Sequence, residues 1–164
     1  MQSLMTTDSR FGLSRQSARL QAGVSFTLVA PIKVGRIQEV VQVIKDRIQP
    51  LAYPQSVVEV DIPLAVTEAL ANGVVHGNKC DSRKTITVSV RASRRRFRCV
   101  VTDEGAGFDP DHIPDPLDAT NEPPTSGRGL HLIRSLMSRV SFNARGNQIR
   151  MLLELPRNGN GAGG

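Results

Sequence analysis

EALANGVVHGN, residues 68–78, sets a carboxylate, an amide and an imidazole at intervals of four residues in an otherwise apolar segment. Residues four apart share one face of an α-helix, so Glu68, Asn72 and His76 would form a ladder about 12 Å long. The apolar positions around them wrap most of the helix, which predicts that the helix is buried. Polar groups on a buried helix must be hydrogen-bonded or face a cavity, because burying an unpaired carboxylate is costly.

Two interpretations of this ladder remain open from the residues alone. The Asn72 oxygen is a hard ligand of the kind Mg²⁺ accepts, together with waters and phosphate oxygens. Glu68, one turn earlier, would then serve as a general base for a group that attacks phosphate. The alternative is that the stripe simply meets solvent at the edge of the domain, and His76 is equally well explained as a structural histidine.

Hydrophobic patterning around this helix predicts the other elements. Alternation predicts strands at 24–30, 84–93 and 97–103, with the last two forming a hairpin. Helical spacing predicts amphipathic helices at 32–51 and 128–140, and two short strands at 141–155 surround a turn at Arg145 to Asn147. The helix bearing the ladder is expected to begin near Asp61 as N-cap, with Pro63 in its first turn, or else to kink at Pro63.

These elements predict a single α+β domain. Its fold class is a two-layer α/β sandwich, in which about three helices cover one face of a mixed, mostly antiparallel sheet. The chain of 164 residues divides into a flexible N-terminal arm (1–22), the domain (23–156) and a flexible tail (157–164). Its apolar runs are far shorter than the roughly 20 residues of a membrane-spanning helix, so a soluble protein is expected.

Charge and cysteine content narrow the function classes. The net charge is +6, yet only one dense cluster of basic residues exists, RASRRRFR at 91–98, at the turn of the hairpin. It is interpreted first as a solvated turn, next as a site for an acidic protein partner, and last as a nucleic-acid site. Cys80 and Cys99 lack zinc-ligand spacing, which favours free thiols in a reducing cytoplasm.

Two glycine-rich motifs complete the pattern. TDEGAGFDP (102–110) follows a strand with an aspartate that could accept from an amino group such as that of adenine, and its glycines allow close backbone approach. TSGRGLHLI (125–133) opens a helix with free backbone N–H groups, a typical phosphate-binding arrangement. The segment 109–126 between them holds five prolines and is expected to form a lid over bound phosphates.

In this order and spacing, the three motifs resemble the Bergerat ATP-binding fold of the GHKL superfamily, which includes gyrases and histidine kinases. ExxxNxxxHGN looks like its N-box, DEGAGF like its first glycine box and SGRGL like its second. The resemblance covers residues 24–155. The small size and the wording of the motifs are most similar to the bacterial anti-sigma factor serine protein kinases.

The resemblance implies a role for each matching position. Glu68 would be the catalytic base and Asn72 the Mg²⁺ ligand, with His76 orienting neighbouring groups or the phosphate. Residues implied in ATP binding are Asn72, His76, Asp103, Gly105, Gly107, Gly127, Arg128, Gly129 and Leu130. Asp103 would bind the adenine amino group, and Gly127 to Gly129 would meet the phosphates. Gly73 departs from the alanine usual in the family, a change that costs a helix about 1 kcal/mol in propensity.

The implied function is that of a cytoplasmic serine/threonine protein kinase that uses ATP and Mg²⁺. It would phosphorylate a small STAS-like anti-sigma antagonist and sequester a sigma factor, and a homodimer is a further expectation. A non-catalytic, nucleotide-dependent regulatory module of the same fold is the main alternative. The catalytic domain of a histidine kinase ranks lower, because the chain is not expected to have room for a preceding dimerisation hairpin that carries a phosphoacceptor histidine. Direct DNA binding ranks lowest, because no recognition helix is evident.

Overall fold

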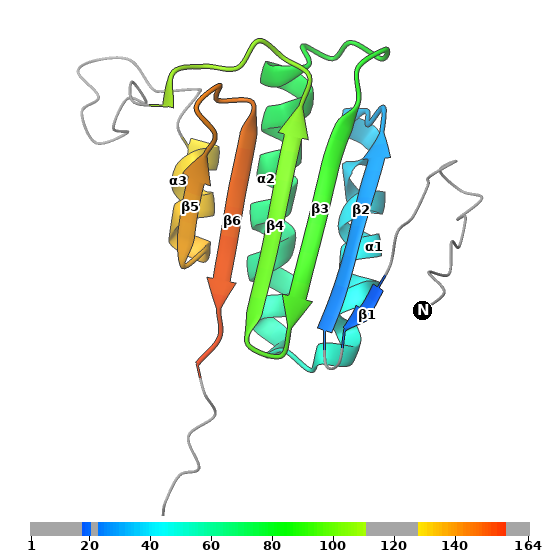
Figure 1. Cartoon of the computed structure of the whole chain (residues 1–164), viewed down its shortest axis with the longest axis vertical. Coiled ribbons are helices and arrows are strands. Elements are labelled where there is room, and N and C mark those ends of the chain that lie inside the picture. Colours follow the sequence, from blue (N-terminus) through cyan, green and yellow to red (C-terminus); the bar gives the residue numbers. More distant parts are fainter. Residues whose placement is uncertain (1–17, 21–22, 111–127, 157–164) are drawn as a thin grey trace, which may run out of the picture.

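The computed structural model describes residues 18–20, 23–110 and 128–156 as one α+β unit (Figure 1). In chain order its main elements are β1 (Ala18–Leu20), β2 (Gly23–Ala30), α1 (Ile37–Ile48), α2 (Ile62–Asn72), β3 (Ile86–Ser93), β4 (Arg96–Asp103), α3 (Arg128–Leu136), β5 (Arg139–Phe142) and β6 (Gln148–Glu154). The strands form one sheet in the order β1-β2-β3-β4-β6-β5.

All five pairs of neighbouring strands are antiparallel. The predicted hairpin is confirmed, because β3 and β4 pair along their whole length from Ile86 opposite Asp103 to Ser93 opposite Arg96. The strand β1 was not predicted, and it extends the sheet by pairing with β2 from the segment expected to be a flexible arm. The prediction of a partly mixed sheet was wrong for the described strands.

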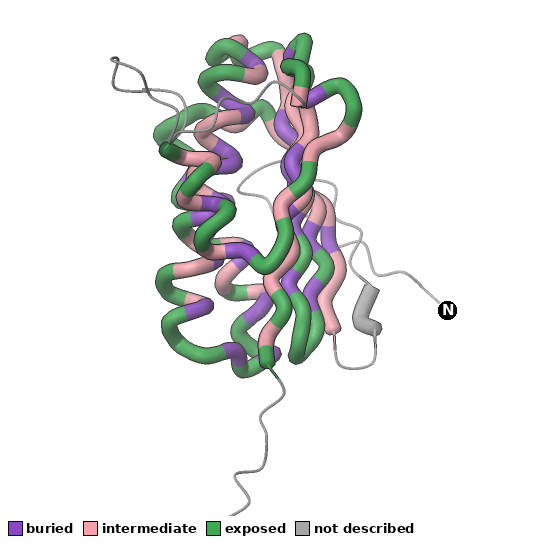
Figure 2. The backbone as a smooth tube through the Cα atoms, turned by 90° about the vertical axis from the view of Figure 1, so that its left-hand side faces the viewer, coloured by how far each residue is buried: buried purple, intermediate pink, exposed green. Residues whose placement is uncertain are grey.

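The three helices cover one face of the sheet, which confirms the two-layer sandwich (Figures 1 and 2). Alternate residues of each central strand point into the layer between sheet and helices, as the buried Val88, Val90 and Phe97 show. The helices contribute to the same core, for example through Ile44 and Leu70, which expose no surface. The opposite face of the sheet is not covered by any described helix or strand.

The start of the ladder-bearing helix differs from the prediction. A π-helical turn, Val57–Asp61, precedes α2, and Asp61 has helical backbone angles and makes no capping hydrogen bond through its side chain. Pro63 lies at the first positions of α2, directly after this turn. Proline has no backbone N–H to donate. Pro63 lies where the π-helical hydrogen bonds (i to i+5) give way to α-helical ones (i to i+4), so the absent donor does not interrupt the helix.

The end of α3 also differs. The helix stops at Leu136, and the chain enters β5 at Arg139, so Val140 belongs to a strand although its spacing fits the helix. Met137 remains buried just beyond the helix, with its N–H bonded to the carbonyl of Ile133. The helical spacing of apolar residues extends beyond the end of α3 because Met137 and the strand that follows pack on the same core.

Two sequence expectations about the whole chain can be compared with the described part. No helix there is long and apolar enough to cross a membrane. Both cysteines are free thiols, Cys80 exposed and Cys99 buried in the core, as predicted. Burial raises the pKa of the Cys99 thiol to about 12, so this thiol stays protonated and unreactive at neutral pH.

Candidate functional site

Helix α2 carries the predicted base and metal ligand on its edge facing α3. Its inner face is buried on the sheet through Ala65, Ala69 and Leu70, while Glu68 and Asn72 are only half-buried. A β-carbon added to Gly129 of α3 would lie 2.5 Å from Glu68 Oε2 and 3.6 Å from Asn72 Nδ2. The second glycine motif therefore meets the first two rungs of the ladder, although about sixty residues separate them in sequence.

His76 does not continue this ladder. Helix α2 ends at Asn72, and the chain continues as a π-helical turn, Gly73–Gly77, which has more residues per turn than an α-helix. His76 is exposed in this turn and makes no side-chain hydrogen bond with the described part of the chain. Its predicted orienting role stays a prediction, and the two residues that share a wall with α3 are Glu68 and Asn72.

The carboxylate of Asp103 lies beside the same π-helical turn. It projects from the end of β4 against Gly77, where any added β-carbon would overlap the carboxylate. A β-carbon on Gly73 would lie 3.7 Å from the Asp103 β-carbon and 3.1 Å from Ile86 Cδ1. Gly73 is therefore packed closely against β3 and β4, and an alanine here would press on the Ile86 side chain.

The Asp103 side chain is a half-buried acceptor with one backbone donor. The N–H of Gly105 donates to Asp103 Oδ1 at 2.8 Å. Burial raises the pKa of this carboxyl. Backbone hydrogen bonds from Gly105 and from Asp103 itself, and the charges of Lys84 and Arg145, lower the pKa by a smaller amount. Ionisation is thus less favourable than in water, and a ligand N–H that donates to the free lone pairs would offset that cost. This suits recognition of an amino group.

The loop after Asp103 is anchored on the β5–β6 turn. Arg145 Nη2 donates to the carbonyl of Gly105 at 3.1 Å, and Asn147 Nδ2 donates to the carbonyl of Asp103 at 2.9 Å. Gly107 has φ of 83° and sits so close to the Arg145 carbonyl that no side chain fits. The rings of Phe108 and Phe142 meet edge to face with centroids 5.1 Å apart.

Sequence reasoning missed these anchoring residues. The sequence predicts only a turn at Arg145 to Asn147, and in the structure Gly146 in that turn has φ of 72°. Their partners lie in the first glycine motif, about forty positions earlier, and a single sequence carries no signal for that pairing. A β-carbon on Gly146 would overlap the backbone of Phe108, so the turn packs directly on that motif.

Asn78, the last residue of the motif at 68–78, has no role predicted from the sequence, and in the structure it is a buried connector between two segments. It is only 4% exposed and is the sole buried polar residue in the described ranges. Its Nδ2 donates to the carbonyl of Thr85 at 2.9 Å, and its Oδ1 accepts from the N–H of Glu104 at 2.8 Å. It therefore joins the end of the helical segment to β4 beside Asp103.

Replacing Asn78 should destabilise the fold. Asn78→Ala leaves the N–H of Glu104 and the carbonyl of Thr85 without their part-buried partner, at about 1–3 kcal/mol for each unsatisfied group. We expect the free energy of unfolding, measured by urea denaturation, to fall by about 2–4 kcal/mol in total. Asn78→Asp keeps the acceptor and loses the donor, so its free energy of unfolding should lie between those of the parent protein and Asn78→Ala. An unchanged urea midpoint in both variants would contradict the connector role.

The remaining predicted residues lie at the start of α3 or outside the described residues. Arg128, the first residue of α3, is exposed, and Leu130 is half-buried against the core. The start of this helix, whose first N–H groups have no partner within the helix, lies beside Glu68 and Asn72 at Gly129. Gly127 and all of the predicted lid beyond Pro110 lie outside the described residues.

The donor set around Asn72 fits a magnesium ion that arrives with phosphates. The described ranges contain no cluster of three or more His, Cys, Asp or Glu side chains that could hold a metal. Asn72 would supply one amide oxygen, Glu68 lies one turn away, and the missing β-carbon of Gly129 lets Glu68 Oε2 approach α3 closely. Mg²⁺ characteristically takes one or two protein ligands plus waters and substrate phosphates, so this sparse set is sufficient.

Comparison with known proteins agrees with this geometry. The model of the histidine kinase-like ATPase domain family matches residues 30–153. The chain is 30% identical over 92 residues to the serine-protein kinase RsbW of Bacillus licheniformis, an alignment that covers 49% of this chain and 54% of the relative. It is 27% identical over 90 residues to the anti-sigma F factor of Clostridium perfringens strain SM101, covering 54% and 64%.

A second serine-protein kinase RsbW, from Bacillus subtilis, is 30% identical over 86 residues and is covered over 54% of its length. The chain thus spans about half the length of the curated relatives it matches. The family match spans β3, β4 and all three helices, and with them both halves of the site. The sandwich, the α2–α3 contact and this match lead to one conclusion: the chain belongs to the histidine kinase-like ATPase domain family.

Proposed function

We propose that this protein is an ATP- and Mg²⁺-dependent serine/threonine protein kinase that acts as an anti-sigma regulatory factor. It would phosphorylate a small STAS-like antagonist protein and sequester a sigma factor in the cytoplasm. The observation that carries the proposal is the meeting of Glu68 and Asn72 with Gly129 at the α2–α3 contact. The names of two relatives, serine-protein kinase and anti-sigma F factor, support the regulatory half of the proposal.

The two ends of the site would bind different parts of ATP, adenine at one end and the phosphates at the other. Asp103, beside Gly77, would accept a hydrogen bond from the amino group of adenine. Glu68 lies nine residues before Gly77 along the helical segment, about 13 Å away at the rise of an α-helix. Phosphates extending from the adenine end would therefore reach Asn72 and the N–H groups at the start of α3.

Glu68 would act on the substrate hydroxyl. Its carboxylate would take the proton as the hydroxyl oxygen attacks the γ-phosphorus, and the bond from that phosphorus to the β–γ bridging oxygen would break, leaving ADP. Mg²⁺ bound with ATP supplies neutralisation of the phosphate charge. Asn72 would hold this ion from the next turn of α2, and half-burial of both side chains limits access of competing water.

The direct test is transfer to a candidate antagonist. Purified protein, Mg²⁺ and ATP labelled at the γ-phosphate are incubated with each STAS-like protein of the source cell, and the labelled residue is identified by mass spectrometry. A labelled serine or threonine supports the proposal. Tight ATP binding with no consumption of ATP, with or without the antagonist, would instead establish the non-catalytic module.

A methyl group at Gly129 should separate folding from chemistry. Gly129→Ala places a β-carbon 2.5 Å from Glu68 Oε2, the far end of a flexible side chain that can rotate away. We expect the free energy of unfolding to change by less than about 1 kcal/mol, because alanine also favours the helix. Transfer should fall by about 10²-fold, because a displacement near 1 Å of a catalytic group has that effect.

The comparison variant for this test is Gly35→Ala, since a β-carbon at Gly35 meets nothing within 4 Å. It should leave both transfer and ATP affinity unchanged. Full activity in Gly129→Ala would contradict the contact between the second glycine motif and the base.

A further inference from the structure

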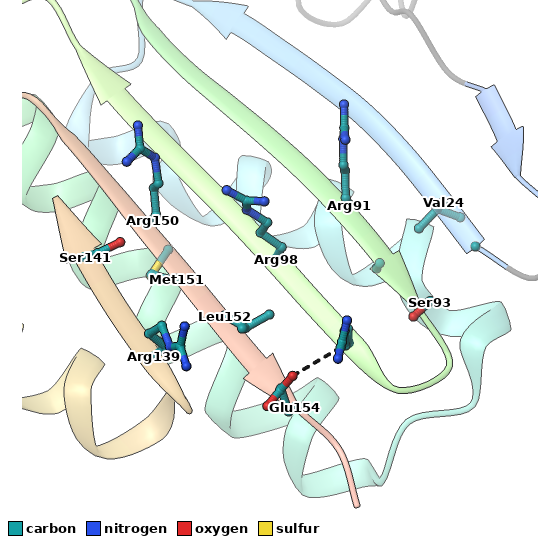
Figure 3. A pocket seen from close by; sticks show the side chains of 13 residues that line it. Val24, Arg91, Ser93, Arg98, Arg139, Ser141, Arg150, Met151, Leu152 and Glu154 are labelled. Carbon is teal, nitrogen blue, oxygen red and sulfur yellow. Dashed lines mark ion pairs between the residues drawn. The ribbon is translucent and has the colours of Figure 1, made fainter. Parts of the chain in front are cut away.

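The open face of the sheet bears a hollow that has no part in the nucleotide site. It encloses about 820 Å³ and is lined from β2, β3, β4, β5 and β6 (Figure 3). Five of its lining residues are arginines: Arg91, Arg96, Arg98, Arg139 and Arg150. None of the predicted ATP-binding residues that the structure describes lines it, because those residues lie on the helical side and at the far end of β4.

The positive charge in this hollow is almost unbalanced. Arg96 pairs with Glu154, with 3.1 Å between Nε and Oε1, while the other four arginines make no ion pair with any described residue. Arg91 and Arg98 occupy directly opposite positions on β3 and β4. Like charges directly opposite on neighbouring strands are destabilising, so this face carries repulsion that folding alone does not require.

The strand register arranges these charges around an apolar centre. Arg91 lies opposite Arg98, Arg98 opposite Leu152, and Leu152 opposite Arg139. This row crosses β3, β4, β6 and β5, three strand spacings or about 14 Å. An α-helix with its side chains is about 10–12 Å across, so one helix could rest on Leu152 with carboxylates directed to Arg98 on one side and Arg139 on the other.

Other occupants fit these observations less well. A second copy of this chain would oppose arginine to arginine, because a two-fold contact joins the same patch on both copies. Single-stranded nucleic acid binds to sheets through exposed aromatic rings. The aromatic residues in the described strands, Phe26, Phe97 and Phe142, all pack on the core and leave this face without one.

We propose that the arginine-lined hollow on the open face of the sheet binds an acidic amphipathic helix of a partner protein. Arginine forks bind carboxylates in bidentate pairs, and Leu152 supplies the apolar contact that a phosphodiester backbone does not use. The proposal does not rest on phosphoryl transfer, since a chain without kinase activity would present the same face. It gives the cluster at 91–98 a function on the strands, whereas only Arg94 and Arg95 lie in the hairpin turn.

The test uses the full chain and a defined probe. The probe is a fluorescein-labelled peptide of about 16 residues, helical, with a leucine stripe flanked by glutamates. Binding is followed by fluorescence anisotropy at about 0.15 M salt, with and without ATP. The double substitution Arg98→Ser and Arg139→Ser removes the arginine on each side of Leu152. Arg94→Ser combined with Arg95→Ser removes the same charge from the turn, outside the hollow.

We expect the Arg98/Arg139 variant to bind the probe at least about tenfold more weakly and the Arg94/Arg95 variant to change less than about twofold. The first variant should melt no lower than the parent protein, because it relieves like-charge repulsion. Equal losses in both variants would overturn the proposal. So would tighter binding of duplex or single-stranded DNA of similar charge, or self-association in sedimentation that disappears in the Arg98/Arg139 variant.

Discussion

Glu68→Gln should abolish phosphoryl transfer while leaving ATP binding close to that of the parent protein. The substitution keeps the size and the half-buried position of the side chain on α2 but removes the basic oxygen. A positioned general base contributes about 10²–10⁴-fold to a rate, and a loss of that size is expected in single-turnover transfer. Nucleotide affinity, measured by isothermal titration, should change by less than about threefold, because the proposed ATP-binding residues Asn72 and Asp103 are unchanged.

Glu59→Gln is the matched control for this substitution. Glu59 lies earlier on the same helical segment, exposed and paired with Lys45, with 2.6 Å between the charged atoms. An exposed ion pair is worth at most about 1 kcal/mol, so this variant should transfer phosphate at the parental rate. Transfer that survives in Glu68→Gln would remove Glu68 from the mechanism, whatever the control shows.

The second large effect is expected at Gly105. An added β-carbon would lie 2.7 Å from Asp103 Oδ1 and closer still to the backbone carbonyl of Gly77. Backbone atoms of two packed elements cannot move aside cheaply, so Gly105→Ala must push the loop off the π-helical turn and weaken the bond from its N–H to Asp103. We expect a loss of about 1–3 kcal/mol in the free energy of unfolding and a fall of about 10–100-fold in ATP affinity.

Urea denaturation and titration with ATP give the two readouts for Gly105→Ala. The Gly35→Ala control should leave both parameters at the parental values, because open space surrounds that position. Normal ATP affinity in Gly105→Ala at an intact fold would show that the Asp103 side chain is not part of the adenine site.

Much of this architecture could be predicted because it rests on local patterns. Alternation identified β2, β3 and β4, and helical spacing identified α1 and the core of α2. The family resemblance assigned Glu68, Asn72 and Gly129 to one ATP site, and in the structure Gly129 lies against Glu68. Periodicity succeeds here because each element buries one face on a shared core.

Two of the errors have their physical origin in π-helical turns. A helical ladder drawn at a constant 3.6 residues per turn places His76 above Asn72, whereas the π-helical turn at Gly73–Gly77 leaves His76 exposed. A similar turn at Val57–Asp61 precedes α2 in place of an N-cap at Asp61. The turn at Gly73–Gly77 packs closely against Ile86 and Asp103, and these are contacts that no single segment specifies.

The β5–β6 turn offers a way to engineer the protein. Arg145 and Asn147 hold the carbonyls of Gly105 and Asp103 from the five-residue connection between β5 and β6. A library of turn sequences grafted at this place would alter how firmly the adenine end is held without changing any residue assigned to bind or transform ATP. Nucleotide affinity could thereby be tuned in graded steps, with the catalytic edge of α2 left as a constant background.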